Sequence, residues 1–169
     1  MHELAPEILS FAREHGARTS ADVLADGWPE LLDMIAPALE QVDWFLPNDD
    51  QAMKLTGTDD VEAAGRALVE RGVGGCAITC GARGSLVVTG DAAERVPAFE
   101  IEVVDTTGCG DVFHGAYAAG LAGGMSLEER VRLASVAAAL KASRLGGQAG
   151  APRRTEVDAD LDRLPARHA

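Results

Sequence analysis

The sequence predicts an α/β fold, in which helices cover the faces of a mostly parallel sheet. Short apolar runs of strand length, 42–46 and 76–79, alternate with segments of helical periodicity in the first half of the chain. Two later strand-like segments, 85–89 and 95–99, follow each other without a helix between them. Because such a pair needs no crossover helix, an antiparallel edge is expected on an otherwise parallel sheet.

The first half of the chain supplies the alternating units. Residues 3–16 form an expected amphipathic helix that ends at its glycine, and a strand is expected at 17–24. A second helix is expected at 28–41, although Pro37 should bend or shorten it. The apolar run 42–46 then has the length of a buried strand.

The remaining elements follow the same logic. Pro47 and Asn48 form a turn into a helix, and a clear helix is expected at 59–71. The run 101–104 resembles a strand and precedes a glycine turn and a helix of small residues, 112–121. The last segments expected to be helical are 127–145, which is rich in alanine, and 156–164.

Composition restricts the partners of this chain of 169 residues. Its formal net charge of −12 argues against nucleic acid or an anionic membrane as a partner, but not against ATP, which local N–H groups can bind. No apolar run reaches the roughly 18 residues of a membrane span. The three cysteines have neither zinc-ribbon nor CxxC spacing, and no secretory signal is apparent. A reducing cytoplasm is therefore the expected location.

The most informative segment is Asp105-Thr106-Thr107-Gly108-Cys109-Gly110-Asp111. Glycines at a helix start leave main-chain N–H groups accessible, and together with the helix dipole they form an anion site. A carboxylate inside that turn would repel a bound phosphate, so Asp111 suggests a base that removes a proton from an attacking hydroxyl. The alternative is an ordinary first-turn carboxylate after a tight turn.

This segment resembles the C-terminal signature of the ribokinase-like carbohydrate kinases, the PfkB family. The usual form is Asp-Thr-x-Gly-Ala-Gly-Asp, and here Cys109 takes the place of the alanine. The resemblance implies a three-layer ribokinase-like sandwich that transfers the γ-phosphoryl group of ATP to a sugar hydroxyl. It also implies that Asp111 is the base that meets the substrate and that the N–H groups of Gly108, Cys109 and Gly110 stabilise charge. Thr106 and Thr107 would lie beside ATP.

Two further nucleotide contacts follow from the resemblance. Thr79, Gly81 and Gly84 match the family's Thr-x-Gly-x-x-Gly turn, whose N–H groups approach the ATP phosphates and ribose. A plain hairpin turn would have the same glycines. Ser135 falls where the family often places an asparagine near the adenine, so this contact departs from the pattern.

Asn48 and Gln51 match the family's Asn-x-x-Glu motif, which organises Mg²⁺ through water. The glutamate is replaced by Gln51, which keeps an oxygen but lacks the charge that Mg²⁺ prefers; Asp49 or Asp50 could compensate. The alternative is an ordinary helix cap.

Asp105 and Thr107 match the family's site for a monovalent cation such as K⁺, which the loop 141–150 would complete with carbonyl oxygens. The alternative for Asp105 is a cap on the turn that follows.

The resemblance covers residues 1–169 as a single domain, but only the C-terminal, nucleotide-binding and catalytic portion of the family. The N-terminal part with its β lid is not found in this sequence. A non-catalytic nucleotide-binding or assembly module is therefore the alternative function, and a homo-oligomer is possible. An NAD-binding domain is disfavoured, because no Gly-x-Gly-x-x-Gly follows an early strand.

Overall fold

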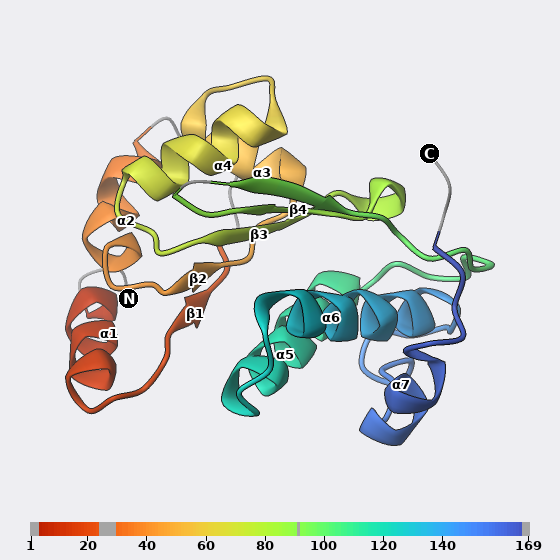
Figure 1. Cartoon of the computed structure of the whole chain (residues 1–169). Helices are drawn as coiled ribbons and strands as arrows, with labels where there is room; N and C mark the ends of the chain where they lie inside the picture. Colours follow the sequence, from red (N-terminus) through yellow and green to blue (C-terminus); the bar gives the residue numbers. More distant parts are fainter. Residues whose placement is uncertain (1–3, 24–29, 91, 167–169) are drawn as a thin grey trace. The chain divides into compact units, whose positions relative to one another are not determined.

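The computed structural model describes residues 4–23, 30–90 and 92–166, which form two compact units (Figure 1). Unit 1 consists of residues 1–80 and 86–95, and unit 2 of residues 81–85 and 96–169. No helix in the described ranges is long and apolar enough to cross a membrane. Leu24 and Trp28, at the ends of a predicted strand and a predicted helix, lie outside the described residues.

A five-stranded mixed sheet has its strands in chain order: β1 (Ser20–Ala21), β2 (Trp44–Phe45), β3 (Cys76–Thr79), β4 (Ser85–Val88) and β5 (Ala93–Val96). The first three strands are parallel, with Ser20 opposite Trp44 and Phe45 opposite Cys76. Between β4 and β5 the N–H of Thr89 donates to the carbonyl of Ala92 at 2.9 Å, as at the closed end of a hairpin. The mixed α/β character expected from the sequence is confirmed.

Helices α2, α3 and α4 lie on one face of this sheet (Figure 1). The helices of unit 1 are α1 (Ala5–Glu14), α2 (Leu31–Leu39), α3 (Asp49–Thr56) and α4 (Val61–Glu70). Ala64 and Leu68 of α4 are fully buried in one core with Ile78 and Val88 of the sheet. Pro37 lies inside α2, close to its C-terminal end. The apolar face of α4 therefore provides the burial that its sequence predicted.

Helix α1 exposes most of the apolar face that the sequence predicted for it. Leu4, Ile8 and Phe11 are 58%, 64% and 62% exposed, whereas Leu9 packs against the core of unit 1. Their spacing of four and three residues places the three exposed side chains on one side of the helix. The helix is amphipathic as expected, but none of its residues is buried.

Unit 2 contains a single-turn 3₁₀ helix, η1 (Gly81–Arg83), and the helices α5 (Cys109–Ala122), α6 (Leu127–Ala142) and α7 (Arg154–Asp160). Helices α5 and α6 pack against each other. The rings of Phe113 and Tyr117 stack with their centroids 6.4 Å apart, and the guanidinium of Arg130 lies 5.2 Å from the Tyr117 ring centroid. A second core forms around buried side chains of α6, α7 and one loop: Phe99, Leu133, Val136, Ala137, Leu140 and Val157.

One strand prediction was wrong, and another had the wrong bounds. Residues 101–104 form no strand, and Val103 and Val104 are 60% and 54% exposed. The N–H groups of Val104 and Asp105 both donate to the carbonyl of Ala142, at 2.8 and 3.1 Å, so the end of α6 replaces a strand partner. The strand predicted at 95–99 is β5, which starts earlier, at Ala93, and ends at Val96, because the proline that follows has no N–H to donate to a ladder.

Candidate functional site: the turn before helix α5

A glycine in the left-handed conformation starts α5. Gly108 is the N-cap, with φ +79° and ψ 7°. A side chain at this position would be strained, and its Cβ would lie 3.3 Å from the Cα of Gly147. The turn therefore requires glycine here because of its backbone conformation and because a neighbouring loop lies close.

The first turn of α5 leaves main-chain donors available. The N–H of Cys109 donates to the carbonyl of Thr106 at 3.1 Å. Among the described residues, no acceptor lies within hydrogen-bond reach of the N–H groups of Gly108, Gly110 or Asp111. A Cβ added at Gly110 would meet no atom within 4 Å. Accessible donors at the positive end of a 14-residue helix are the features of an anion site.

Asp111 lies in this first helical turn and its side chain is exposed. No described side chain or main-chain group bonds to its carboxylate. Because the carboxylate has no partner, it can accept a proton from a hydroxyl group that reaches the turn. The structure thus places an available base and accessible N–H donors in one turn of helix.

The side chain of Cys109 is half-buried against the protein, whereas that of Asp111 is exposed. Its Sγ lies 3.8 Å from the carbonyl of Ala138 and 4.0 Å from the carbonyl of Asp105. Burial raises the pKa of its thiol. A half-buried, protonated thiol in these contacts is a packing group, which explains how cysteine can replace alanine in the signature.

Asp105 caps the turn with both carboxylate oxygens. Its Oδ1 accepts from the N–H of Thr107 at 2.9 Å, and its Oδ2 accepts from the N–H of Gly146 at 2.8 Å. The hydrogen bonds from Thr107, followed by that from Gly146, lower the pKa of Asp105 from 3.8 to about 2. The structural alternative for Asp105, a cap on the following turn, is therefore realised, while the side chains of Thr106 and Thr107 are exposed.

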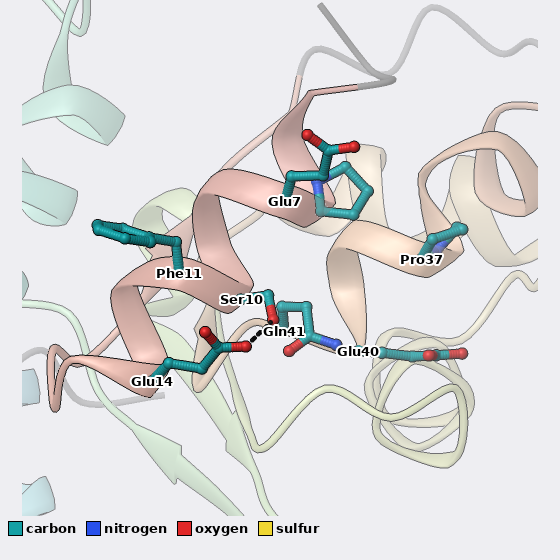
Figure 2. A pocket seen from close by; sticks show the side chains of 8 residues that line it. Glu7, Ser10, Phe11, Glu14, Pro37, Glu40 and Gln41 are labelled. Atoms are coloured by element: carbon teal, nitrogen blue, oxygen red, sulfur yellow. Dashed lines mark hydrogen bonds between the residues drawn. The ribbon is translucent and has the colours of Figure 1, made fainter.

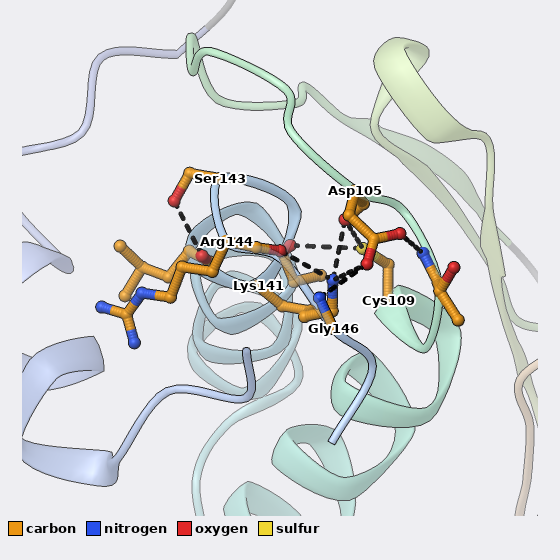
Figure 3. A network of polar contacts seen from close by, with 9 residues as sticks. Asp105, Cys109, Lys141, Ser143, Arg144 and Gly146 are labelled. Carbon is orange, nitrogen blue, oxygen red and sulfur yellow. Dashed lines mark hydrogen bonds and ion pairs between the residues drawn. The ribbon is translucent and has the colours of Figure 1, made fainter. Parts of the chain in front are cut away.

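Lys141 was missed by the sequence analysis. Its side chain is fully buried, and its Nζ donates to the carbonyl of Asp105 at 2.7 Å and to that of Arg144 at 3.2 Å (Figure 3). The same ammonium lies 3.7 Å from Asp105 Oδ2. A signal was present in the sequence, because Lys141 is the only charged residue in the stretch 133–142, whose other residues except Ser135 are apolar.

This ammonium changes the expectation of a K⁺ site at Asp105 and Thr107. The carbonyl oxygens of Asp105 and of Arg144, in the loop 141–150, already accept hydrogen bonds from Lys141, and Asp105 Oδ2 is paired with the same ammonium. A metal cation on the same oxygens would lie within a few ångströms of a buried positive charge. The residues present therefore do not fit a monovalent metal ion.

The two glycines of the other predicted phosphate turn have different roles. Gly84 has φ +85°, and a Cβ there would lie 2.0 Å from the carbonyl of Val96. This close approach by itself requires glycine at position 84. Gly81 has φ +57° with open space around it, and its carbonyl accepts from the N–H of Gly84 at 3.1 Å. Only Gly81 therefore has room for a ligand beside its backbone. Ser135 is half-buried on α6.

In unit 1 the predicted residues Asn48 and Thr79 come together. They form a parallel bridge, and the N–H of Thr79 donates to the carbonyl of Pro47 at 3.0 Å. Asn48 and Gln51 form a reciprocal capping box at the start of α3. The cap that was the alternative to Mg²⁺ binding is thus present, and it engages one side-chain oxygen of each residue.

The neighbouring carboxylates offer little compensation for the missing glutamate. Asp50 Oδ2 forms an ion pair of 2.6 Å with Lys54, and Asp49 Oδ1 accepts from the N–H of Asp50 at 3.0 Å. Nowhere in the described ranges do three or more His, Cys, Asp or Glu side chains gather as a metal cluster.

An open hollow of about 570 Å³ lies between α1 and α2 in unit 1 (Figure 2). It is lined by three carboxylates, those of Glu7, Glu14 and Glu40, together with Ser10, which donates to Glu14 at 3.2 Å. Negative charges on its walls would repel phosphate groups. The hollow is therefore unsuited to a nucleotide.

Residues 2–154 match the pfkB family carbohydrate kinases. The chain is 34% identical to the ribokinase of Lactococcus lactis over 166 residues, which are 96% of this chain and 51% of that protein. It is 32% identical to the deoxyribokinase of Salmonella typhimurium over 155 residues, 89% of this chain and 51% of that protein. The structure of Arabidopsis thaliana ribokinase with ribose and ATP superimposes with a TM-score of 0.84 at 27% identity, covering 96% and 53% of the two chains.

These relatives confirm the ribokinase-like α/β fold expected from the sequence. The chain spans about half the length of the curated relatives it matches. The match includes the turn 105–111, where the exposed carboxylate and the accessible N–H groups lie. The chain belongs to the pfkB family of carbohydrate kinases.

Proposed function

We propose that this chain carries the nucleotide and catalytic part of an ATP-dependent kinase that phosphorylates a hydroxyl group of a sugar or sugar-like alcohol. The observation that supports this most strongly is the exposed carboxylate of Asp111 beside the accessible N–H groups of Gly110 and Gly108. Phosphoryl transfer depends mainly on positioning and on stabilising charge at the transferred group, and a base must take the proton of the attacking hydroxyl.

Each part of the turn has a role in this proposal. Asp111 accepts the proton from the sugar hydroxyl and thereby contacts the substrate. The N–H groups of Gly108 and Gly110 hold the γ-phosphoryl oxygens, and the N–H of Asp111 is a further donor. The N–H of Cys109 joins them only if it leaves the carbonyl of Thr106, to which it now donates.

The remaining contacts concern the rest of the nucleotide. Thr79 and Gly81 line the phosphates and ribose, while Gly84 keeps their turn in shape through its contact with Val96. Thr106 and Thr107 lie in the turn itself, where ATP would bind, and Ser135 lies near the adenine. We also propose that the protein acts in the cytoplasm, where ATP and sugars are available. Nucleic acids and membranes are not among its proposed partners.

Mg²⁺ would be bound together with ATP and would supply positive charge that offsets the charge of the phosphates. Asn48 and Gln51 would hold it through water, with lone pairs that the capping box leaves available. The K⁺ ion expected from the resemblance is not part of this proposal, because the Lys141 ammonium uses the oxygens it would need.

A second candidate is a nucleotide-binding or assembly module without kinase activity. It is favoured by the glutamine at position 51, which lacks the charge that Mg²⁺ prefers. In this case ATP would bind to the turn before α5, but no sugar would be phosphorylated.

Two measurements test the proposal. Calorimetric titration of the chain with ATP and Mg²⁺ measures nucleotide binding. An ADP-release assay over a panel of pentoses, deoxypentoses and hexoses measures transfer, both for the chain alone and for a fusion to the N-terminal half of the Lactococcus ribokinase. Sugar-dependent ADP release by the fusion, lost in Asp111→Asn, would support the kinase. ATP binding without transfer by the fusion would favour the binding module, and absence of ATP binding would refute both.

A further inference from the structure

Lys141 brings a fixed positive charge to the residue that opens the catalytic turn. The side chain is fully buried on α6, and its ammonium has three oxygens around it (Figure 3). Two are carbonyl oxygens, of Asp105 at 2.7 Å and Arg144 at 3.2 Å, and the third is Asp105 Oδ2 at 3.7 Å. Two of the three ammonium protons are thus donated in hydrogen bonds, and the carboxylate lies at ion-pair distance.

The surrounding contacts hold these oxygens in place. Asp105 Oδ2 also accepts from the N–H of Gly146, and the guanidinium of Arg144 pairs with Glu156 at 2.7 Å. The carbonyl of Ala142 accepts from the N–H groups of Val104 and Asp105. The ammonium therefore joins the start of the turn to the loop after α6, and it belongs to a connected network rather than to a surface ion pair.

We propose that the Lys141 ammonium is a built-in monovalent cation, which takes the place of a bound metal ion between the turn before α5 and the loop after α6. A cation of charge +1 that bridges carbonyl and carboxylate oxygens is the common chemistry of K⁺ and of an ammonium group. Here that charge is covalently attached, so the site is filled at every salt composition. The folded chain is thus stabilised without a preference for K⁺ over other monovalent cations.

The Lys141 ammonium and a bound K⁺ ion would compete for the same oxygens and would repel each other. Burying a charged group is costly unless it is paired and hydrogen-bonded, and Lys141 satisfies this condition through the same oxygens a metal ion would need. Two positive charges a few ångströms apart repel each other strongly where little water screens them. The proposal does not depend on kinase activity, because it concerns the stability of the folded chain.

The first test is the thermal stability of the wild-type chain at constant ionic strength. The chloride salts of K⁺, NH₄⁺, Na⁺ and tetramethylammonium are compared. The proposal expects melting temperatures that agree within about 1 °C. A rise specific to K⁺ of more than roughly 2–4 °C, the shift that about 1 kcal/mol produces in a domain of this size, would show that a metal ion binds in spite of Lys141 and would overturn the proposal.

The second test is chemical rescue of two variants. Lys141→Ala removes the side chain beyond Cβ and leaves a space for K⁺, NH₄⁺ or n-propylammonium. Lys141→Met fills that space without a charge and is the matched control. The proposal expects both variants to melt at lower temperature. NH₄⁺ or n-propylammonium should raise the melting temperature of Lys141→Ala by at least roughly 2 °C over tetramethylammonium, and should leave Lys141→Met unchanged.

The melting experiments test the role of Lys141 independently of kinase activity. If Lys141→Ala folds but no cation raises its melting temperature more than it raises that of Lys141→Met, the ammonium is only a packing group and the proposal fails. If Lys141→Ala does not fold, the wild-type salt series still decides. A chain that binds no ATP would refute the kinase and leave both melting experiments interpretable.

Discussion

Asn48 and Gln51 exchange hydrogen bonds at the start of α3. The N–H of Gln51 donates to Asn48 Oδ1 at 2.7 Å, and the N–H of Asn48 donates to Gln51 Oε1 at 2.8 Å. A glutamate, the residue expected at position 51 from the resemblance, would accept the same hydrogen bond. The replacement by glutamine therefore preserves the helix cap and removes only a negative charge.

We expect Gln51→Glu to lower the Mg²⁺ concentration that half-saturates ATP binding or transfer. The added carboxylate gives the water shell of Mg²⁺ a charged partner, although Asp49 and Asp50 nearby reduce the gain. Magnesium titration at fixed ATP measures the effect. Asn48→Ala removes the cap together with the second proposed Mg²⁺ partner, and it should destabilise the chain by about 1 kcal/mol and raise the Mg²⁺ requirement. An unchanged or higher Mg²⁺ requirement in Gln51→Glu would show that position 51 does not act on the metal.

Asp111→Asn should reduce kcat of the active fusion by roughly 10²–10⁴, the usual cost of losing a positioned base, with ATP affinity nearly unchanged. The side chain is exposed and forms no hydrogen bond or ion pair with the described residues, so folding should not suffer. Steady-state kinetics and nucleotide titration measure the two effects. Glu128→Gln, in the first turn of α6, is the control for loss of a first-turn carboxylate. Full activity of Asp111→Asn would exclude Asp111 as the base.

Gly110→Val should weaken binding of ATP more than binding of adenosine. A Cβ at position 110 meets no atom of the protein, so the branched side chain would fill the space that phosphate oxygens need. Gly115→Val is the matched control, because Gly115 lies in the same helix and also has open space around it. Both variants share the small cost of a β-branched residue in a helix. An equal loss of ATP affinity in the two variants would place the anion site elsewhere.

The carboxylate of Asp105 should make part of the chain's stability depend on pH. Hydrogen bonds from Thr107 and Gly146, with the Lys141 ammonium nearby, lower its pKa to about 2 from an ordinary value of 3.8. A lowered pKa means that the folded state favours the carboxylate. The stabilisation of the folded chain by the charged carboxylate is therefore complete above about pH 4 and is lost as the pH falls towards 2.

Urea denaturation of wild type and Asp105→Asn between pH 2 and 7 tests this. The wild type should be more stable at neutral pH, and the difference between the two proteins should shrink below pH 4. A difference that stays constant across this range would mean that the carboxylate charge contributes nothing to the network around Lys141.

The isolated chain should self-associate and lack sugar kinase activity of its own. Leu4, Ile8 and Phe11 form an exposed apolar stripe on α1, and exposed apolar patches favour association. Ile8→Lys combined with Phe11→Glu should shift size-exclusion elution towards the monomer. Glu7→Gln, which leaves the stripe intact, should not. A monodisperse wild-type monomer that phosphorylates a sugar unaided would contradict this prediction.

Local signals in the sequence determined the elements whose causes lie within a few residues. The apolar run Cys76–Thr79 is β3 with the predicted bounds, and the predicted helix at 59–71 is α4, capped by Asp60 through a 2.8 Å bond from the N–H of Ala63. Caps and apolar periodicity act over one or two helical turns, so they can be read from the chain itself. The glycine turn and Asp111 were predicted for the same reason, together with the family resemblance.

Tertiary structure decided the features that depend on distant partners. The strand-like run 101–104 forms a loop, and the N–H of Val104 at its end donates to Ala142 at the end of α6 rather than to a neighbouring strand. Lys141 meets Asp105 across 36 residues, and although its place in a stretch without other charges favours burial, no local pattern specifies the oxygens that it contacts. Likewise, the apolar periodicity of α1 predicted a helix, but not whether its face would be covered. Burial and ion pairing are set by the packing of segments far apart in sequence, which the propensities of single segments do not encode.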